Sequence, residues 1–327
     1  MIINNRYTIE KFIGKGHFGV VYKGQSISNA FSVAIKYDHN NVGIVKHEAK
    51  MLNYLQEKNM KKIPLVYWFG VCFEPFHKKN LPCLIMPFYD CSLTTYMKNN
   101  EITKKNLSAL MIFILKILEN IHTRYVIHRD IKPDNFMIKG GDVFLIDFGF
   151  STFYVNDKFE HTPLLVNKNI VGTPLYISHN THCGITPSRR DDLISLGYLY
   201  LKMLMGYLEW ENNDTCVSLN FLKKYSMQIM LKEKTNFENI DDALFEEDDK
   251  IKDVGEKLNT DIYNAKNVNM CFLKTFEHIK NTCEMINDKK IFLYLQKVYS
   301  LNYKDEPDYK ELTQLFLSSL NLHEKTI

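Results

Sequence analysis

The chain has 327 residues, 45% of them hydrophobic and 24% charged, a composition that predicts a folded globular protein and excludes a largely disordered one. Its 41 Lys and Arg residues against 38 Asp and Glu leave a net charge of +3, too small to indicate nucleic acid or an anionic membrane as a direct partner. The most apolar window, Leu107 to Leu118, is shorter than the roughly 20 residues of a membrane span, so we expect a buried helix there.

The cysteines and the N-terminus indicate a reducing compartment. None of the seven cysteines forms a Cys-x-x-Cys pair, and the chain opens with polar residues where a secretory signal peptide would be apolar. We therefore expect an intracellular protein, cytoplasmic or nuclear. The abundance of Asn, Ile and Lys indicates only an AT-rich genome, and a viral protein in a host cell is one of the origins considered. His179, His182 and Cys183 suggest zinc ligands, but no second pair stands at ligand spacing and we favour a structural role for them.

The N-terminal part alternates short apolar runs with glycine or polar turns. The runs at 7–13, 19–23 and 31–37 predict an antiparallel meander. Apolar residues from Val42 to Gln56 recur at helical spacing and predict one helix packed on that sheet. Further strands are expected at 65–73 and 81–87.

After Tyr89 the pattern becomes helical, so the sequence predicts an α+β protein with a small β-rich part and a larger, mainly helical part. The segment at about 232–261 is rich in acids and lacks apolar periodicity, which predicts a solvated insert. The predicted helices lie at 93–98, with Ser92 as a cap, at 104–125, at 190–207, and within 289–320.

A glycine-rich run stands between the first two predicted strands. Gly14, Gly16 and Gly19 have the spacing GxGxxG, and the missing side chains would let backbone N–H groups approach phosphate oxygens. A dinucleotide-binding oxidoreductase uses the same spacing, but its run leads into a helix. Here the run leads into the strand that contains Val21, which favours a hairpin lying over phosphates.

Lys36 ends a predicted strand, where its ammonium group could reach the α- and β-phosphates of a nucleotide. Glu48, on the helix that follows, is predicted to hold Lys36 by an ion pair. Glu57 is an alternative partner that we favour less.

The strongest signal is the sequence His-Arg-Asp-Ile-Lys-Pro-Asp-Asn at 128–135, followed by Asp-Phe-Gly at 147–149. Phosphoryl transfer needs a carboxylate that positions the attacking hydroxyl, oxygens that hold Mg²⁺, and cations that neutralise the moving phosphoryl group. The residues that match these needs are Asp130 for the hydroxyl, Asn135 and Asp147 for the metal, and Lys132 for the phosphoryl group.

These motifs resemble the protein kinase superfamily over about residues 7–320. Within it the chain is most similar to the casein kinase 1 group, in the catalytic string HRDIKPDNF, in NKNIVGT at 167–173, in NTHCGITPSRRDDLISLGY at 180–198 and in DEPDY at 305–309. The vaccinia-related kinases share a Pro-Ser-Arg-Arg run like that at 187–190 and are the second candidate.

The resemblance implies a bilobal kinase fold with an N-lobe at 1–86, a hinge at 87–90, a C-lobe at 91–327 and an activation segment at 147–180. It implies ATP and Mg²⁺ as cofactors and direct γ-phosphate transfer to Ser or Thr hydroxyls of protein substrates. We expect the protein to be a monomer and to have basal activity without modification. The expected catalytic residues are Lys36, Glu48, Asp130, Lys132, Asn135 and Asp147. The expected nucleotide-binding residues are Ile13, Gly14, Gly16, Gly19, Val21, Ala34, Lys36, Met86 as gatekeeper, Pro87, Phe88 and Tyr89.

Further roles also follow from the resemblance. Asp192 would brace the catalytic loop, Ser178-His179-Asn180 would take the place of the usual Ala-Pro-Glu, and Thr173 with Lys132 indicates a Ser/Thr acceptor.

One departure concerns substrate recognition. Leu175 stands where the group generally has an Arg that binds substrate phosphate, so a phosphate-primed preference is not implied. The cations left for substrate binding are Lys158, Lys168, Arg189 and Lys223 or Lys224.

A different class, an ATP-binding scaffold that acts through partners of the acidic insert, is the alternative function. It is less favoured because Asp130, Asn135 and Asp147 are all present.

Overall fold

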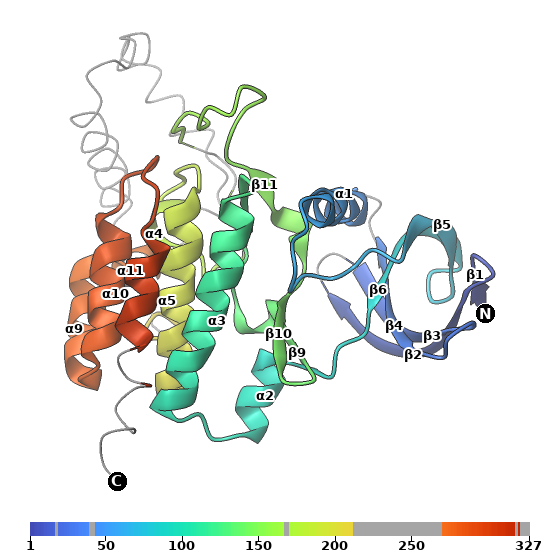
Figure 1. The fold of residues 1–327 in the computed structure, drawn as a ribbon, viewed down its shortest axis with the longest axis horizontal. Coiled ribbons are helices and arrows are strands. Elements are labelled where there is room, and N and C mark those ends of the chain that lie inside the picture. The colour runs from blue at the N-terminus through green and yellow to red at the C-terminus, as the bar shows by residue number, and fades with distance from the viewer. Residues whose placement is uncertain (17–18, 39–42, 167–169, 212–269, 318–319, 321–327) are drawn as a thin grey trace. The chain divides into compact units, whose positions relative to one another are not determined.

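The computed structural model describes residues 1–16, 19–38, 43–166, 170–211, 270–317 and 320, so the predicted acidic insert lies outside the described residues. The chain divides into two compact units, which are described one at a time (Figure 1). The first unit comprises Met1–Glu101, Lys116–His128 and Pro133–Phe153, and the second comprises Ile102–Leu115, Arg129–Lys132 and Tyr154–Ile327.

The first unit is built on an antiparallel sheet with the strand order β1-β2-β3-β4-β6-β5 (Figure 1). Successive side chains of a strand point to opposite faces, and Val20, Tyr22, Ile35 and Tyr37 belong to the core on one face. This sheet confirms the predicted meander; β1 was not predicted because two residues carry no alternation. The strands are β1 (Ile2–Ile3), β2 (Tyr7–Gly16), β3 (Gly19–Ser26), β4 (Ser32–Asp38), β5 (Trp68–Glu74) and β6 (Lys79–Pro87).

Helix α1 (Ile44–Glu57) confirms the helix predicted after the third strand. Gly43, at φ 80°, precedes the helix, and its N–H donates to the Asp38 carboxylate over 3.0 Å. A left-handed backbone of this kind is easiest for glycine, so the residue type at position 43 suits the conformation that precedes the helix. Leu52 and Leu55 are fully buried on the same face as Glu48, which is 1% exposed. The helix therefore carries a carboxylate into the interior of the unit.

The rest of the first unit consists of short elements that support loops. A hairpin of β9 and β10 pairs with β7, and β8 pairs with β11. The Ser92 hydroxyl accepts the N–H of Thr95 over 3.2 Å and caps α2, as predicted. The bounds are β7 (Cys91–Ser92), α2 (Leu93–Asn99), β8 (Val126–Ile127), η1 (Pro133–Asn135), β9 (Phe136–Lys139), β10 (Asp142–Leu145), η2 (Phe148–Phe150) and β11 (Thr152–Phe153).

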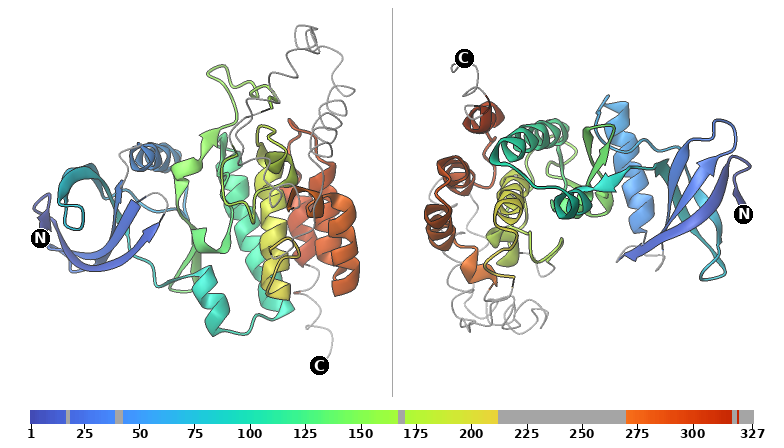
Figure 2. Two further views of the ribbon diagram at one scale, coloured as in Figure 1. Left: turned by 180° about the vertical axis from the view of Figure 1, so that it is seen from behind. Right: turned by 90° about the horizontal axis from the view of Figure 1, so that it is seen from below.

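The second unit is helical and centres on α5 (Arg189–Met205), most of whose residues are buried. Helix α10 packs on α5 with α9 and α11 beside it, as both views show (Figure 1, Figure 2). Gly197 allows this close approach, since a Cβ there would stand 2.4 Å from Leu295 Cδ2. The remaining bounds are α3 (Lys104–His122), which contributes residues to both units, α4 (His179–His182), α9 (Phe276–Ile286), α10 (Lys289–Ser300) and α11 (Tyr309–Leu317).

The predicted helices are present, and their ends differ for local reasons. Helix α3 ends before the predicted position because Tyr125 adopts φ 64°, a conformation no helix accepts. Helix α5 ends at Met205 because Gly206, at φ 81°, closes it in the left-handed conformation. With an antiparallel sheet first and mainly helices after it, the predicted α+β class is confirmed.

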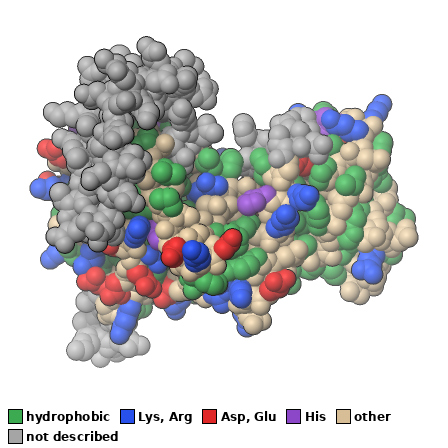
Figure 3. All heavy atoms as spheres, turned by 90° about the horizontal axis from the view of Figure 1, so that it is seen from above, with side chains coloured by type: hydrophobic (Ala, Val, Ile, Leu, Met, Phe, Trp, Pro, Cys, Tyr) green, Lys and Arg blue, Asp and Glu red, His purple; other side chains and the backbone are tan. Residues whose placement is uncertain are grey.

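Two surface observations bear on the partners expected from the sequence. No helix in the described part of the chain is both long and apolar enough to cross a membrane. On the face drawn in Figure 3, Lys and Arg side chains are interspersed with acidic and uncharged ones, and among the described residues neither sign covers that face continuously.

The packing of α10 on α5 predicts a difference between two truncations in the second unit. Leu295→Ala removes a fully buried side chain that faces Gly197, and we expect a loss of about 2–5 kcal/mol in the free energy of unfolding. Met285→Ala, at a residue 70% exposed on α9, should change it by less than about 0.5 kcal/mol. Urea denaturation followed by circular dichroism measures both; equal losses would contradict the packing described.

Candidate active site

The glycine-rich run lies in the β2–β3 hairpin of the first unit. Gly14 is paired with Val21, and Gly16 with Gly19. A Cβ built on Gly14 or Gly16 would meet no atom within 4 Å, so the space beside this backbone is open. Because the run joins two antiparallel strands rather than a strand and a helix, the dinucleotide-binding alternative fails.

The sheet brings several of the expected nucleotide-binding residues onto one face. Val21 is paired with Lys36, and Ala34 with Met86, so these four side chains lie on the face opposite the core residues Val20 and Ile35. Ile13, on β2, is 49% exposed.

The expected hinge begins at the end of β6. Pro87 is the last residue of β6 and pairs with Val33 of β4. The Phe88 carbonyl accepts the Lys139 ammonium over 3.1 Å, and Tyr89 is buried at 5% exposure. Pairing with β4 therefore holds the start of this segment, and Lys139 of β9 holds the carbonyl of Phe88.

Lys36 forms the predicted ion pair with Glu48, and also a second one. Its Nζ lies 2.7 Å from Glu48 Oε2 and 2.8 Å from Asp147 Oδ1. Burial by itself would lower the pKa of Lys36, but the carboxylates of Asp147 and Glu48 outweigh it and raise that pKa above its ordinary value. Lys36 therefore keeps its charge throughout the physiological range.

The β9–β10 hairpin places Asn135 and Asp147 at one end of the sheet formed with β7. Phe136 is paired with Leu145, and the N–H of Ile146 donates to the carbonyl of Asn135 over 2.9 Å. Asp147 follows directly, at φ 64°, a left-handed conformation that turns the chain out of the hairpin. The hairpin thus sets the backbone of both expected metal ligands, an amide and a carboxylate, and hard oxygen ligands of this kind suit Mg²⁺.

In the second unit, the loop at 129–132, which is the expected catalytic loop, meets the expected activation segment at Thr173. The hydroxyl of Thr173 donates to Asp130 Oδ1 over 2.7 Å, and its N–H donates to the same oxygen over 2.9 Å. The Lys132 ammonium donates to the Thr173 hydroxyl over 2.7 Å and pairs with Asp130 Oδ2 over 2.8 Å. Asp130 is buried at 3% exposure, so hydrogen bonds and an adjacent cation satisfy its charge.

Two features of the backbone keep this arrangement in place. Arg129, at φ 68°, donates its N–H to Asp192 Oδ1 over 2.8 Å, which is the bracing contact predicted for Asp192. Gly172, at φ 108°, passes so close to the loop that a Cβ there would lie 2.5 Å from the Arg129 carbonyl oxygen. Only glycine fits this position without displacing the backbone.

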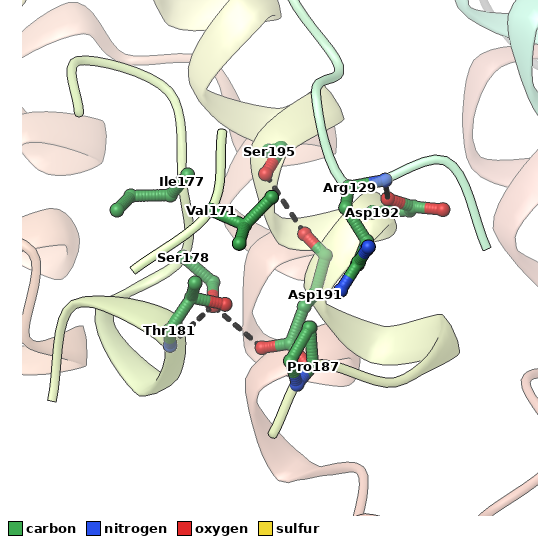
Figure 4. A pocket seen from close by; sticks show the side chains of 9 residues that line it. All are labelled: Arg129, Val171, Ile177, Ser178, Thr181, Pro187, Asp191, Asp192 and Ser195. Atoms are coloured by element: carbon green, nitrogen blue, oxygen red, sulfur yellow. Dashed lines mark hydrogen bonds between the residues drawn. The ribbon is translucent and has the colours of Figure 1, made fainter. Parts of the chain in front are cut away.

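A small pocket behind the catalytic loop is organised by Asp191 (Figure 4). Asp191 Oδ1 accepts the Ser178 hydroxyl over 2.5 Å and the Asn180 amide over 3.0 Å, while its Oδ2 accepts the N–H of Ser188 over 2.7 Å. Ser178 and Asn180 are members of the Ser-His-Asn sequence predicted to end the activation segment. One buried carboxylate therefore ties the end of that segment to the start of α5.

Sequence reasoning missed three residues of this region. Asp191 had a readable signal, because Ser188 and Asp191 have the Ser-x-x-Asp spacing of a capping box. Trp210 and Lys274 had none, since nothing in their neighbourhood indicates that they contact the segment after Thr173, as they do.

The candidate substrate cations have different surroundings. Arg189 donates to the Lys304 carbonyl over 2.8 Å and lies over the ring of Tyr154 at 4.7 Å, so it serves to hold the activation segment. Lys158 is exposed. Lys168, Lys223 and Lys224 lie outside the described residues.

Two of the three residues considered as zinc ligands, His179 and Cys183, make packing contacts. The His179 ring stacks on Tyr299 at 4.9 Å, and Cys183 Sγ lies 3.0 Å from Cys271 Sγ. Within the described ranges, no group of three or more His, Cys, Asp or Glu side chains lies close enough together to hold a metal ion.

A family model described as the protein kinase domain matches residues 7–299 of the chain. The chain therefore belongs to the protein kinase domain family, and phosphoryl transfer is the chemistry of that family.

The Lys36 ion pairs predict a large effect from a charge-removing substitution. Lys36→Met keeps an unbranched side chain, one atom shorter, but removes the cation between Glu48 and Asp147, so we expect phosphoryl transfer from ATP to fall by about 10² to 10³-fold. Lys62→Met, which breaks the exposed pair of Lys62 and Asp142 in the same unit, is the control and should leave transfer unchanged. Initial rates with radiolabelled ATP measure both; a Lys36→Met protein as active as the control would contradict the role of Lys36.

Proposed function

We propose that this protein kinase domain transfers the γ-phosphate of ATP to Ser or Thr hydroxyls of protein substrates. The observation that carries the proposal is the set of hydrogen bonds in which the Thr173 hydroxyl links Asp130 to Lys132. A buried carboxylate beside a lysine provides an acceptor for a hydroxyl proton and a cation for the phosphoryl group.

On the nucleotide side, the proposed roles follow the chemistry of the first unit's side chains. The backbone of the glycine-rich hairpin and Lys36 would orient the triphosphate, and Val21, Ala34 and Met86 would line the site of the base. Asn135 and Asp147 would hold Mg²⁺, whose charge neutralises phosphate oxygens when it is bound. Glu48 would keep Lys36 in position by the ion pair.

On the acceptor side, Asp130 would accept the hydroxyl proton as the acceptor oxygen bonds to the γ-phosphorus. The bond from that phosphorus to the bridging oxygen breaks in the same step, so ADP leaves and no phosphate passes through the enzyme. Lys132 would contact the γ-phosphate during transfer. Thr173 fixes the separation of these two groups by bonding to both.

The casein kinase 1 group is the subfamily we propose, on the strings that follow the catalytic loop, with the vaccinia-related kinases as the alternative. The proposed divisions are an N-lobe at 1–86, a hinge at 87–90 and a C-lobe at 91–327. No observation favours the scaffold alternative, because each residue type that the transfer needs is present.

The role of Asp130 predicts a specific loss. Asp130→Asn keeps the shape of the side chain but removes the proton acceptor, so transfer to a Ser/Thr peptide should slow by about 10² to 10⁴-fold while ATP still binds. Initial rates and calorimetric titration with Mg-ATP, compared with wild type, measure the two effects. Transfer at the wild-type rate would reject Asp130 as the base, and ATP binding without transfer by either protein would favour the scaffold.

The acceptor class is a separate prediction. With a library of peptides that differ in the acceptor residue and in flanking acids or phosphates, we expect labelling of Ser and Thr and none of Tyr. Mass spectrometry of the products identifies the labelled residue. Equal labelling of Tyr peptides would reject the Ser/Thr assignment without affecting the kinase assignment.

A further inference from the structure

Lys274 is a fully buried lysine in the second unit, just before α9. Its Nζ donates to the carbonyl of Pro174 over 2.6 Å and to that of Ile177 over 2.8 Å, and it lies 3.2 Å from His182 Nδ1. Among the described residues, no Asp or Glu forms an ion pair with it. Its contacts are therefore with the backbone of the segment that follows Thr173.

Burying an ammonium group in this way is costly. Burial lowers the pKa of Lys274 well below its ordinary value. The rings of Tyr198 and Trp210, with centroids 5.4 Å and 5.5 Å from Nζ, offset part of the cost by cation–π attraction. An apolar side chain would fill the same volume without this cost, so the contribution particular to lysine is its set of donors to the two carbonyls.

Trp210 supplies a further donor to the same segment. Its indole N–H donates to the carbonyl of Leu175 over 2.8 Å, and its side chain is buried at 2% exposure. The N–H groups of Tyr176 and Ile177 donate to the Thr173 carbonyl, over 2.8 and 3.0 Å. Side chains distant in sequence thus bind three carbonyls of residues 174–177, and the two N–H bonds to Thr173 fold the segment on itself.

The other end of this segment joins the catalytic loop. Thr173 bonds to Asp130 and Lys132, and Gly172 passes against the Arg129 carbonyl. Residues 174–177 are therefore fixed at one end by the candidate catalytic groups and along their length by Lys274 and Trp210. Pro174 is exposed and Leu175 partly exposed, so the segment presents a surface directly beside Asp130.

We infer that Lys274, assisted by Trp210, is a positioning residue that fixes residues 174–177 as the docking surface for the polypeptide that carries the acceptor hydroxyl. The inference rests on the proposed function, in which Asp130 is the base. A polypeptide whose hydroxyl reaches Asp130 must pass the backbone next to Thr173, and a displacement of about 1 Å in such a surface is enough to cost 10²-fold in rate. Lys274 touches neither ATP nor acceptor in this account, and it acts through the loop.

The test compares Lys274→Met with Tyr200→Phe in the full chain. Lys274→Met keeps an unbranched side chain, one atom shorter, and removes the donors to Pro174 and Ile177. Tyr200→Phe also removes one buried hydrogen bond from the second unit, and that bond, over 2.7 Å, joins Tyr200 to Asp288 rather than to residues 174–177. Trp210→Phe, which keeps an aromatic ring and loses the bond to Leu175, is a second variant should Lys274→Met fail to fold.

Two measurements are made on each protein: steady-state kinetics with a Ser/Thr peptide and Mg-ATP, and amide hydrogen exchange of the peptide containing 173–178. We expect Lys274→Met to lower kcat/KM for the peptide by about 10 to 100-fold, to leave KM for ATP within about twofold, and to speed exchange in 173–178. Trp210→Phe should do the same to a smaller degree, and Tyr200→Phe should match wild type in both.

Three results would overturn the inference: unchanged exchange in 173–178, faster exchange with unchanged kcat/KM, or a loss in Tyr200→Phe as large as in Lys274→Met. Failure of the proposed function would look different. Wild-type protein would then transfer no phosphate, while the exchange measurement would still decide whether Lys274 holds the segment.

Discussion

A buried lysine keeps its charge when carboxylates lie beside it, and in this protein kinase domain one such arrangement joins three segments of the chain. Lys36 comes from a strand, Glu48 from the helix that follows, and Asp147 from the turn after a later hairpin. The cation offsets the repulsion between the buried carboxylate of Glu48 and the partly buried one of Asp147. Strand, helix and turn are therefore arranged so that the Lys36 ammonium group pairs with both carboxylates. A nucleotide site of the proposed kind uses the same ammonium group and the carboxylate of Asp147.

The second unit also contains a buried lysine, Lys274, but its partners differ. Lys274 is buried, as Lys36 is, but carbonyl oxygens and aromatic rings surround it in place of carboxylates. The pKa of Lys274 is lowered, whereas that of Lys36 is raised. The first arrangement keeps a charge available in a site. In the second arrangement the ammonium group donates hydrogen bonds to backbone carbonyls. Lys274 holds Pro174 before Tyr176, and Asp191 holds Ser178 after it.

Much of the fold could be predicted from the sequence because residues close together in the chain determine it. Alternation in the strands, the cap at Ser92 and the spacing of the glycines are set within a few residues, and each predicted element is present. Lys36 with Glu48 was predictable because strand and helix are consecutive. Lys274 was not, because its partners are about 100 residues away and are backbone carbonyls, which leave no trace in residue type. Strand β1 and helix α9 were missed as well, the first because it is two residues long.

We propose that this site catalyses one direct transfer from ATP to a hydroxyl, with Asp130 and Lys132 acting on the acceptor side. The most direct measurement is the stereochemical course at phosphorus, followed with ATP made chiral at the γ-phosphate by oxygen isotopes and a Ser/Thr peptide as acceptor. The account predicts inversion of configuration, since a single in-line displacement inverts the phosphorus. Retention would require two displacements through a phosphorylated enzyme and would contradict the account.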